Sequence, residues 1–267
     1  MIRGSNLTTT SDFNNTQLKG KYISFKSFDQ IELLSYLTYS SLGITKGTII
    51  LLHGIGSGKE SFIGLSNRLS SLGYNSIALD SRAHGLSKGV HCTFGVKEKK
   101  DISELINVLE KQEKINENIG VWGQSLGGAI GIQALGYDKR VKFGVIESTF
   151  SDFTTITHDY FKLHLGFNLK PLTNYLIYRA GQIAGFNPKD ARPVDYCKKI
   201  DQPILIVHGD KDRRIDIKYA KKNFTSIPSK EKTYIKIEKA NHLNVWDVGG
   251  EEYFRKVIKF LDKSTSL

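Results

Sequence analysis

Short apolar runs alternate with longer amphipathic segments along most of this 267-residue chain. Residues 22–27 and 31–38 predict a pair of antiparallel strands, and the later apolar runs predict buried strands at 48–52, 76–79, 119–122, 141–146, 204–207 and 234–237. Helical spacing predicts helices at 62–72, 101–109, 126–135 and 251–261. Buried strands that alternate with helices predict an α/β fold: a mostly parallel, doubly wound sheet with helices on both faces.

The pattern changes between residues 150 and 199. No proline precedes Pro171, and three more follow by position 203. Five residues there have helical spacing, namely Leu172, Tyr175, Leu176, Arg179 and Ile183, whereas the apolar residues of 161–167 alternate and leave their conformation open. We interpret 150–199 as a small helical lid inserted into a single core of residues 20–149 and 200–262. Residues 1–19, rich in Thr, Ser and Asn, predict a loose N-terminal arm.

Composition narrows the functional classes. The net charge is +11, but lysine supplies 29 of the 38 basic residues and is spread over predicted helix faces, which indicates a solvated surface and no nucleic-acid partner. No segment has the roughly 20 apolar residues of a membrane span, and no signal peptide is evident. We therefore expect no stable membrane insertion and a soluble, cytoplasmic chain as given, although a removed signal would leave a secreted or anchored form open. The count of two cysteines, Cys92 and Cys197, allows one disulfide, but two free thiols are the simpler interpretation.

The most informative segment is Gly-Gln-Ser-Leu-Gly-Gly at 123–128, which follows a predicted strand and opens a predicted helix. This is the setting of a G-x-S-x-G nucleophile elbow, where side chains at the flanking glycines would collide with neighbouring backbone. Such a turn aims the Ser125 hydroxyl outward and points the Leu126 backbone N–H at the same place. We predict Ser125 as a nucleophile; the alternative is an ordinary glycine-rich turn.

A serine hydroxyl needs a base, and the histidines supply candidates. Six of the seven histidines are less suited to the role of base. His53, His84 and His208 each precede glycine, where shaping a turn is a sufficient explanation. His91 lies in a loop, and His158 and His164 lie in 150–199. His242 follows the last predicted strand, in a loop that opens on the same sheet edge as the elbow. We predict His242 as the base.

The orienting acid is expected between the serine and the histidine in chain order, at the end of another strand. The strand at 204–207 is followed by Asp210 and Asp212, and Asp212 is better placed to reach an imidazole. Asp210 and Glu147 remain the alternatives. A second oxyanion donor is expected from the glycine-rich loop after residues 48–52, from the Ile55 backbone N–H.

Several segments together resemble the α/β-hydrolase superfamily: His53-Gly54, 80–87, 123–127, 208–212 and His242. Residues 80–87 are similar to the D-x-R-G-H-G-x-S loop of its serine-aminopeptidase-like and esterase-like branch, with Ala83 where glycine is usual. The resemblance covers about residues 20–262 and implies an α/β-hydrolase fold and a triad in the order Ser125, Asp212, His242. It also implies structural roles for Asp80, Arg82 and His84. Gly95, Glu98 and Asp101 are similar to a G-x-x-E-x-x-D pattern of the same branch, which likewise implies a structural role.

We therefore expect a serine hydrolase that forms an acyl-enzyme on Ser125 with a small-molecule ester or acyl substrate, without a metal or cofactor. Tyr175 and Leu176 are the candidate substrate-binding residues of the lid. The alternatives are an aminopeptidase-like or thioesterase activity on the same triad, or a non-catalytic binding protein. A peptidase would need a carboxylate in the lid, and the candidates are Asp152, Asp159 and Asp190. The sequence does not indicate an oligomeric state.

Overall fold

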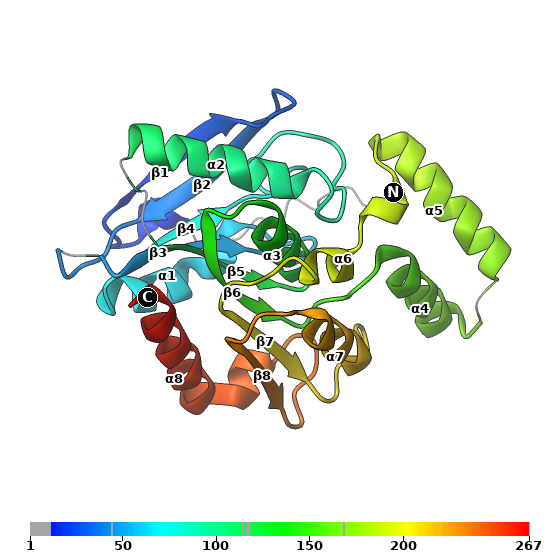
Figure 1. The fold of residues 1–267 in the computed structure, drawn as a ribbon. Coiled ribbons are helices and arrows are strands. Elements are labelled where there is room, and N and C mark those ends of the chain that lie inside the picture. Colours follow the sequence, from blue (N-terminus) through cyan, green and yellow to red (C-terminus); the bar gives the residue numbers. More distant parts are fainter. Residues whose placement is uncertain (1–11, 44, 114, 116–117, 168, 267) are drawn as a thin grey trace.

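A single eight-stranded sheet organises the protein (Figure 1). The computed structural model describes residues 12–43, 45–113, 115, 118–167 and 169–266. The strands are β1 (Gly20–Lys26), β2 (Glu32–Thr38), β3 (Gly47–Leu52), β4 (Tyr74–Leu79), β5 (Ile119–Gln124), β6 (Val141–Glu147), β7 (Ile204–Gly209) and β8 (Lys232–Ile237). Their order is β1-β2-β4-β3-β5-β6-β7-β8. β2 pairs antiparallel with β1 and β4, and the other neighbours are parallel, which confirms the predicted mostly parallel sheet.

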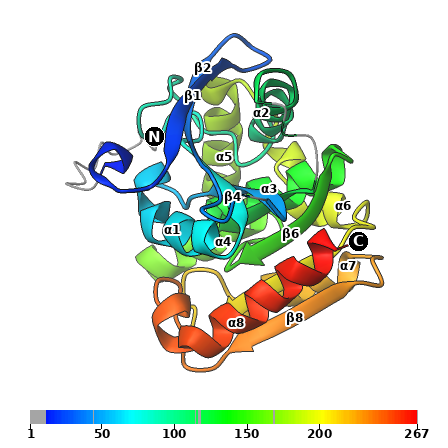
Figure 2. The same ribbon diagram turned by 90° about the vertical axis from the view of Figure 1, so that its left-hand side faces the viewer.

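Both faces of the sheet are covered, so that every residue of the central strands β3 and β4 is buried. On β3, Ile49 and Leu51 pack in one cluster with residues of α1 and α8, whereas Ile50 and Leu52 pack in another with residues of α2, α3 and α7. Figure 2 shows these helices around the sheet. These helices are α1 (Ile63–Ser71), α2 (Glu98–Gln112), α3 (Leu126–Tyr137), α7 (Ile217–Ser226) and α8 (Val245–Thr265). All but α7 were predicted. The predicted segment 251–261 is the part of α8 beyond a bend at Gly250, whose φ is 54°.

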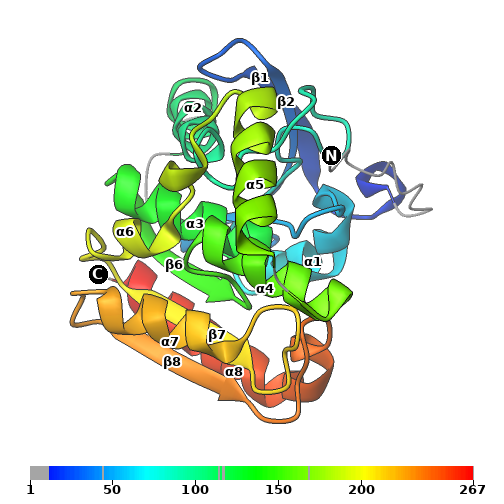
Figure 3. The ribbon, with the colours of Figure 1, turned by 90° about the vertical axis from the view of Figure 1, so that its right-hand side faces the viewer.

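Residues 150–199 are helical, as expected, and consist mainly of two helices that lie in front of the molecule in Figure 3. They are α4 (Phe153–Leu165) and α5 (Lys170–Ala184), called here the α4–α5 hairpin, followed by α6 (Pro193–Cys197). The Asp152 carboxylate caps α4 by accepting from the Thr155 amide at 2.8 Å. Residues 161–165, whose apolar positions alternate, form the last turn of α4, because extending an existing helix costs less than starting a new element.

The N-terminal arm differs in part from the expectation. Residues 1–11 lie outside the described residues, but Phe13 is buried and its ring stacks on Tyr36 with the centroids 4.3 Å apart. Residues after this point are therefore anchored to the sheet. Cys92 and Cys197 are buried free thiols. Within the described ranges, no helix combines the length and apolar character needed to cross a membrane.

Candidate active site

Ser125 occupies a sharp turn between β5 and α3. Its backbone angles are φ 55° and ψ −115°, a conformation that residues with side chains rarely adopt. A Cβ on Gly123 would lie 2.2 Å from the carbonyl oxygen of Gly127, and a Cβ on Gly127 would lie 1.9 Å from that of Leu52. Only glycine fits at either position, which is the steric reason for the G-x-S-x-G spacing. The turn is pinned by the Ser125 amide, which donates to the Glu147 carbonyl at 2.9 Å.

Three side chains from different loops form one line of hydrogen bonds with Ser125 at its end. His242 Nε2 lies 3.0 Å from Ser125 Oγ, and His242 Nδ1 lies 2.7 Å from Asp212 Oδ2. His242 and Asp212 are each 7% exposed, so water does not compete strongly for these bonds. The geometry matches that of a nucleophile, a base and an orienting carboxylate.

Asp212 is held as an anion. Burial acts to raise its pKa, but hydrogen bonds from His208 and His242 and from the Ile215 amide outweigh burial and hold the pKa well below its usual range. The other oxygen, Oδ1, accepts the amides of Arg214 and Ile215, both at 2.9 Å. These bonds fix the carboxylate in position. The sequence assigned His208 only to a turn, yet its Nε2 lies 3.4 Å from Asp212 Oδ2.

The backbone amides of Leu126 and Ile55 are both available beside Ser125. Neither amide donates a hydrogen bond within the part of the chain that the structure describes. Leu126 is the first residue of α3, where amides have no partner in the helix and the helix dipole favours negative charge. Gly54 brings the other loop close, since a Cβ there would lie 3.5 Å from Ser125 Cβ.

Ser125 opens into an apolar cavity of about 620 Å³ between the sheet edge and the α4–α5 hairpin. Its lining consists of Ile55, His91, Cys92, Phe94, Ser125, Leu126, Phe150, Phe153, Ile156, Thr157, Tyr160, Phe161, Leu176, Ile177, Arg179, Ala180, Ile183, Ala184, Phe186 and Ile215. Among these described residues Arg179 alone carries a formal charge, and none is a carboxylate. The volume is typical of small-molecule sites.

The structure separates the two substrate-binding candidates. Leu176 lines the cavity, whereas Tyr175 is 58% exposed and lies outside the lining. Successive positions on a helix point about 100° apart, and this step turns Tyr175 away from the cavity while Leu176 and Ile177 face it. Sequence reasoning missed Phe94, Phe150 and Ile215 as lining residues. The available signal was that each lies in a loop near an expected strand end or helix start.

A family model described as "alpha/beta hydrolase fold" matches residues 47–193, more than half of the chain. The chain belongs to the alpha/beta hydrolase family. This confirms the resemblance drawn from its motifs, and the matched region includes the Ser125 turn and the whole α4–α5 hairpin.

Similarity to individual proteins extends over nearly the whole chain. YqkD of Bacillus subtilis is 22% identical, covering 95% of this chain and 87% of the relative, and the monoglyceride lipase of Saccharomyces cerevisiae is 25% identical, covering 83% and 86%. Among solved structures, an esterase of Pyrococcus furiosus superposes with a TM-score of 0.79 at 21% identity, covering 99% of this chain and all of the other. At that identity the structural match shows the fold.

The two alternative acids of this alpha/beta hydrolase lie in other hydrogen-bond networks. Asp210 Oδ1 accepts the Lys239 amide at 2.6 Å, as expected of a turn aspartate. Glu147 is buried and accepts hydrogen bonds from Trp122 Nε1 at 2.8 Å, from Trp246 Nε1 at 3.0 Å and from the Tyr253 hydroxyl. Its carboxylate therefore ties β6 to β5 and α8.

We expect Glu147→Gln to lower the free energy of unfolding by about 1–3 kcal/mol, because an amide NH₂ would face donors and leave one without an acceptor. Burial raises the pKa of Glu147, against the effect of its three hydrogen bonds. Urea unfolding measures the loss. The matched control is Glu238→Gln in an exposed pair with Lys236, expected to change stability by less than about 0.5 kcal/mol. Equal losses in the two variants would contradict this role.

The segment 80–87 builds structure beside the site. The Asp80 carboxylate accepts a hydrogen bond from the Lys59 ammonium at 2.9 Å, and both side chains are fully buried. Arg82 forms ion pairs with Asp101 at 2.6 Å and with Asp29 at 3.0 Å. The Arg82 ion pairs join the loop after β4 to α2 and to the β1–β2 turn. The charged groups of this segment therefore stabilise loops. Among the described residues, no cluster of His, Cys, Asp or Glu has the arrangement of a metal site.

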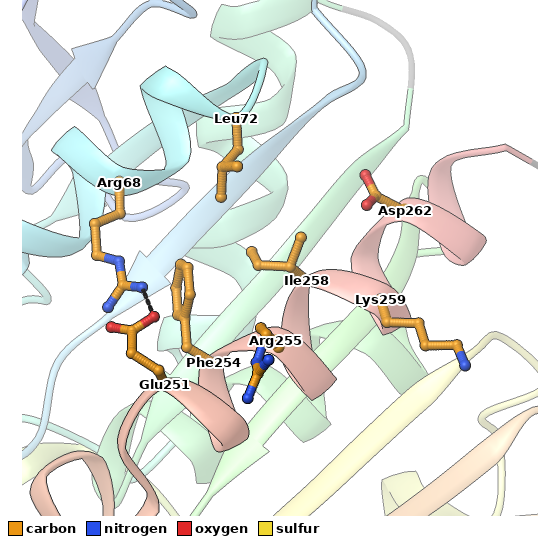
Figure 4. A pocket seen from close by; sticks show the side chains of 8 residues that line it. All are labelled: Arg68, Leu72, Glu251, Phe254, Arg255, Ile258, Lys259 and Asp262. Carbon is orange, nitrogen blue, oxygen red and sulfur yellow. Dashed lines mark hydrogen bonds and ion pairs between the residues drawn. The ribbon is translucent and has the colours of Figure 1, made fainter.

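A second cavity, of about 470 Å³, lies between α1 and α8 (Figure 4). An ion pair between Arg68 and Glu251 spans it at 2.7 Å, and the Arg68 guanidinium lies 3.4 Å from the Phe254 ring centre. It shares no lining residue with the first cavity, and its described lining contains no serine, cysteine or histidine. Its described lining therefore offers no hydroxyl, thiol or imidazole group.

Proposed function

We propose that this protein is a serine hydrolase that cleaves a carboxylic ester through an acyl-enzyme on Ser125. The observation that carries the proposal is the hydrogen-bonded line Ser125–His242–Asp212, which opens into an apolar cavity. The names of the similar proteins, an esterase and a monoglyceride lipase, support the same reaction class. Fold membership alone would not, because the family's fold hosts many chemistries.

In the proposed reaction, Ser125 Oγ attacks the ester carbonyl carbon while His242 Nε2 takes the hydroxyl proton. The resulting oxyanion accepts hydrogen bonds from the Leu126 and Ile55 amides. His242 then gives its proton to the leaving alkoxide, and the alcohol departs. Water, activated by the same imidazole, hydrolyses the acyl-enzyme and restores Ser125. Asp212 keeps the Nδ1 proton in place and stabilises the imidazolium.

We assign the acyl side of the substrate to the cavity and a lid role to residues 150–199. The lining of the cavity is almost wholly apolar and offers no charge partner to a substrate amine. Asp152 pairs with Arg192, Asp159 pairs with Lys218, and Asp190 lies near Asn187 outside the lining. None of the three carboxylates proposed for an aminopeptidase is therefore placed to hold an amine. These positions favour ester cleavage.

The chain-length profile tests this assignment. We expect kcat/KM for p-nitrophenyl esters to rise from acetate to medium acyl chains, by up to about fourfold for each methylene buried (about 0.8 kcal/mol), and then to fall, because a cavity of this size cannot enclose a long chain. Leu176→Ala should flatten the rise.

Leu172→Ala is the matched control on the same helix, since Leu172 is 48% exposed and lies outside the cavity lining. A flat wild-type profile, or equal profiles for Leu176→Ala and Leu172→Ala, would remove the acyl pocket from the proposal. Hydrolysis of any of the esters would still support the reaction class.

A further inference from the structure

The α4–α5 hairpin carries an unusual share of the protein's exposed apolar side chains. Of the seventeen large hydrophobic residues that are exposed in the described part of the chain, nine fall between positions 163 and 183: Leu163, Leu165, Phe167, Leu169, Leu172, Tyr175, Leu176, Tyr178 and Ile183. Scattered exposed leucines are normal, but a contiguous concentration marks an interaction surface.

The arrangement of α5 explains why these side chains remain exposed. The helix buries only a narrow stripe at Thr173, Ile177 and Gly181, spaced four residues apart. Most of the remaining circumference faces away from the core (Figures 1 and 3). Core packing therefore accounts for one side of α5, and Leu176 and Ile183 also border the cavity. The other exposed apolar side chains of the helix face solvent.

The charge of the same segment is strongly positive, since the hairpin's one carboxylate, Asp159, pairs with Lys218. Residues 160–189 contain no aspartate or glutamate, and they contain Lys162, Lys170, Arg179 and Lys189. All four cations are exposed. Apolar side chains interspersed with lysine and arginine, without acidic residues, are the composition of helices that lie in the interface of an anionic membrane.

Loops next to the hairpin also expose apolar side chains. Four more exposed apolar residues lie in loops at the carboxyl ends of parallel strands or just beyond: Ile55, Leu86, Val90 and Leu243. The carboxyl ends of parallel strands meet at one edge of the sheet, so these residues share the edge that holds Ser125. The apolar cavity also opens between this edge and the hairpin.

We propose that the α4–α5 hairpin docks the protein on an anionic lipid surface, with its exposed apolar side chains in the headgroup boundary and its lysines against lipid phosphates. A second copy of the chain fits less well, because a two-fold contact would place these cations opposite one another, and the hairpin's one carboxylate, Asp159, already pairs with Lys218. The inference goes beyond the proposed hydrolysis and does not depend on it.

Vesicle binding tests the proposal, measured by co-sedimentation in a Ser125→Ala background so that no lipid is consumed. We expect binding to phosphatidylcholine vesicles that contain about 30 mol% phosphatidylserine, at least about tenfold weaker binding to pure phosphatidylcholine, and loss of binding in about 1 M salt. Lys162→Glu/Lys170→Glu should weaken binding by at least about 20-fold, and Leu165→Ser/Phe167→Ser by about tenfold or more.

The controls lie at the opposite edge of the sheet. Lys259→Glu/Lys263→Glu on α8 changes net charge equally, and Leu42→Ser removes an exposed leucine near the start of β3. Both should bind like the parent, and unfolding midpoints verify that every variant is folded. Absence of binding by the parent protein would overturn the proposal, as would equal losses in the hairpin and control variants. A dimer that Leu165→Ser/Phe167→Ser dissociates, without vesicle binding, would assign the surface to a second copy instead.

Discussion

Replacing Ser125 with alanine is expected to lower kcat for ester hydrolysis by about 10⁶-fold while the protein remains folded. The nucleophile forms the acyl-enzyme, and Ser125 Oγ lies 3.0 Å from the imidazole that takes its proton. Steady-state hydrolysis of a p-nitrophenyl ester of medium chain length measures the loss. Alanine removes only an oxygen atom, so the strained turn and its Glu147 carbonyl contact are retained.

Thr157→Ala is the matched control, because it removes another hydroxyl from the cavity lining without touching the hydrogen-bonded line to Asp212. We expect its kcat to stay within about tenfold of wild type. A purified, folded Ser125→Ala protein that keeps more than about one hundredth of the wild-type kcat would refute the acyl-enzyme mechanism.

Asp212→Asn is expected to lower kcat by about 10³–10⁴-fold at unchanged folded fraction. An asparagine amide at this position would donate to His242 Nδ1, which favours the tautomer with its proton on Nε2 and leaves no lone pair to accept the Ser125 proton. It would also remove the negative charge that stabilises the imidazolium. Because the second oxygen at position 212 can still accept the Ile215 amide, the loop should keep its shape.

Asp210→Asn and Glu147→Gln distinguish this assignment from its alternatives. Both should affect stability more than kcat, because Asp210 caps the Lys239 amide and Glu147 accepts from two indoles and a phenol. If either variant lost more kcat than Asp212→Asn at equal folded fraction, the acid assigned here would be wrong.

The sequence predicted most of the core because its elements obey simple periodicities. Fully apolar runs such as that of β3 can be buried only in a sheet covered on both faces, and the apolar stripe of α2 fits only one side of it. The Ser125 turn was predictable for a steric reason, since Gly123 and Gly127 leave no space for a Cβ. Local constraints of this kind depend on only a few neighbouring residues and can therefore be predicted from the sequence.

The contacts made by α5 could not be predicted in the same way. Helical spacing placed Tyr175 and Leu176 on one candidate surface, but which of them faces the cavity depends on the rotation of the helix against α4. The small residues Thr173 and Gly181 set that rotation by burying themselves. Likewise, two of the hydrogen-bond donors to Glu147 are Trp246 and Tyr253, which lie about 100 residues away in sequence. No local sequence pattern predicts these contacts.

Labelling with a fluorophosphonate tests the central claim most directly, because this probe phosphonylates a serine only when an adjacent base activates it. The account predicts that the folded protein takes up one probe per chain, that peptide mass spectrometry maps it to Ser125, and that heat denaturation or Ser125→Ala abolishes the reaction. Labelling at another residue, labelling that persists after denaturation, or no labelling of the folded protein would contradict it.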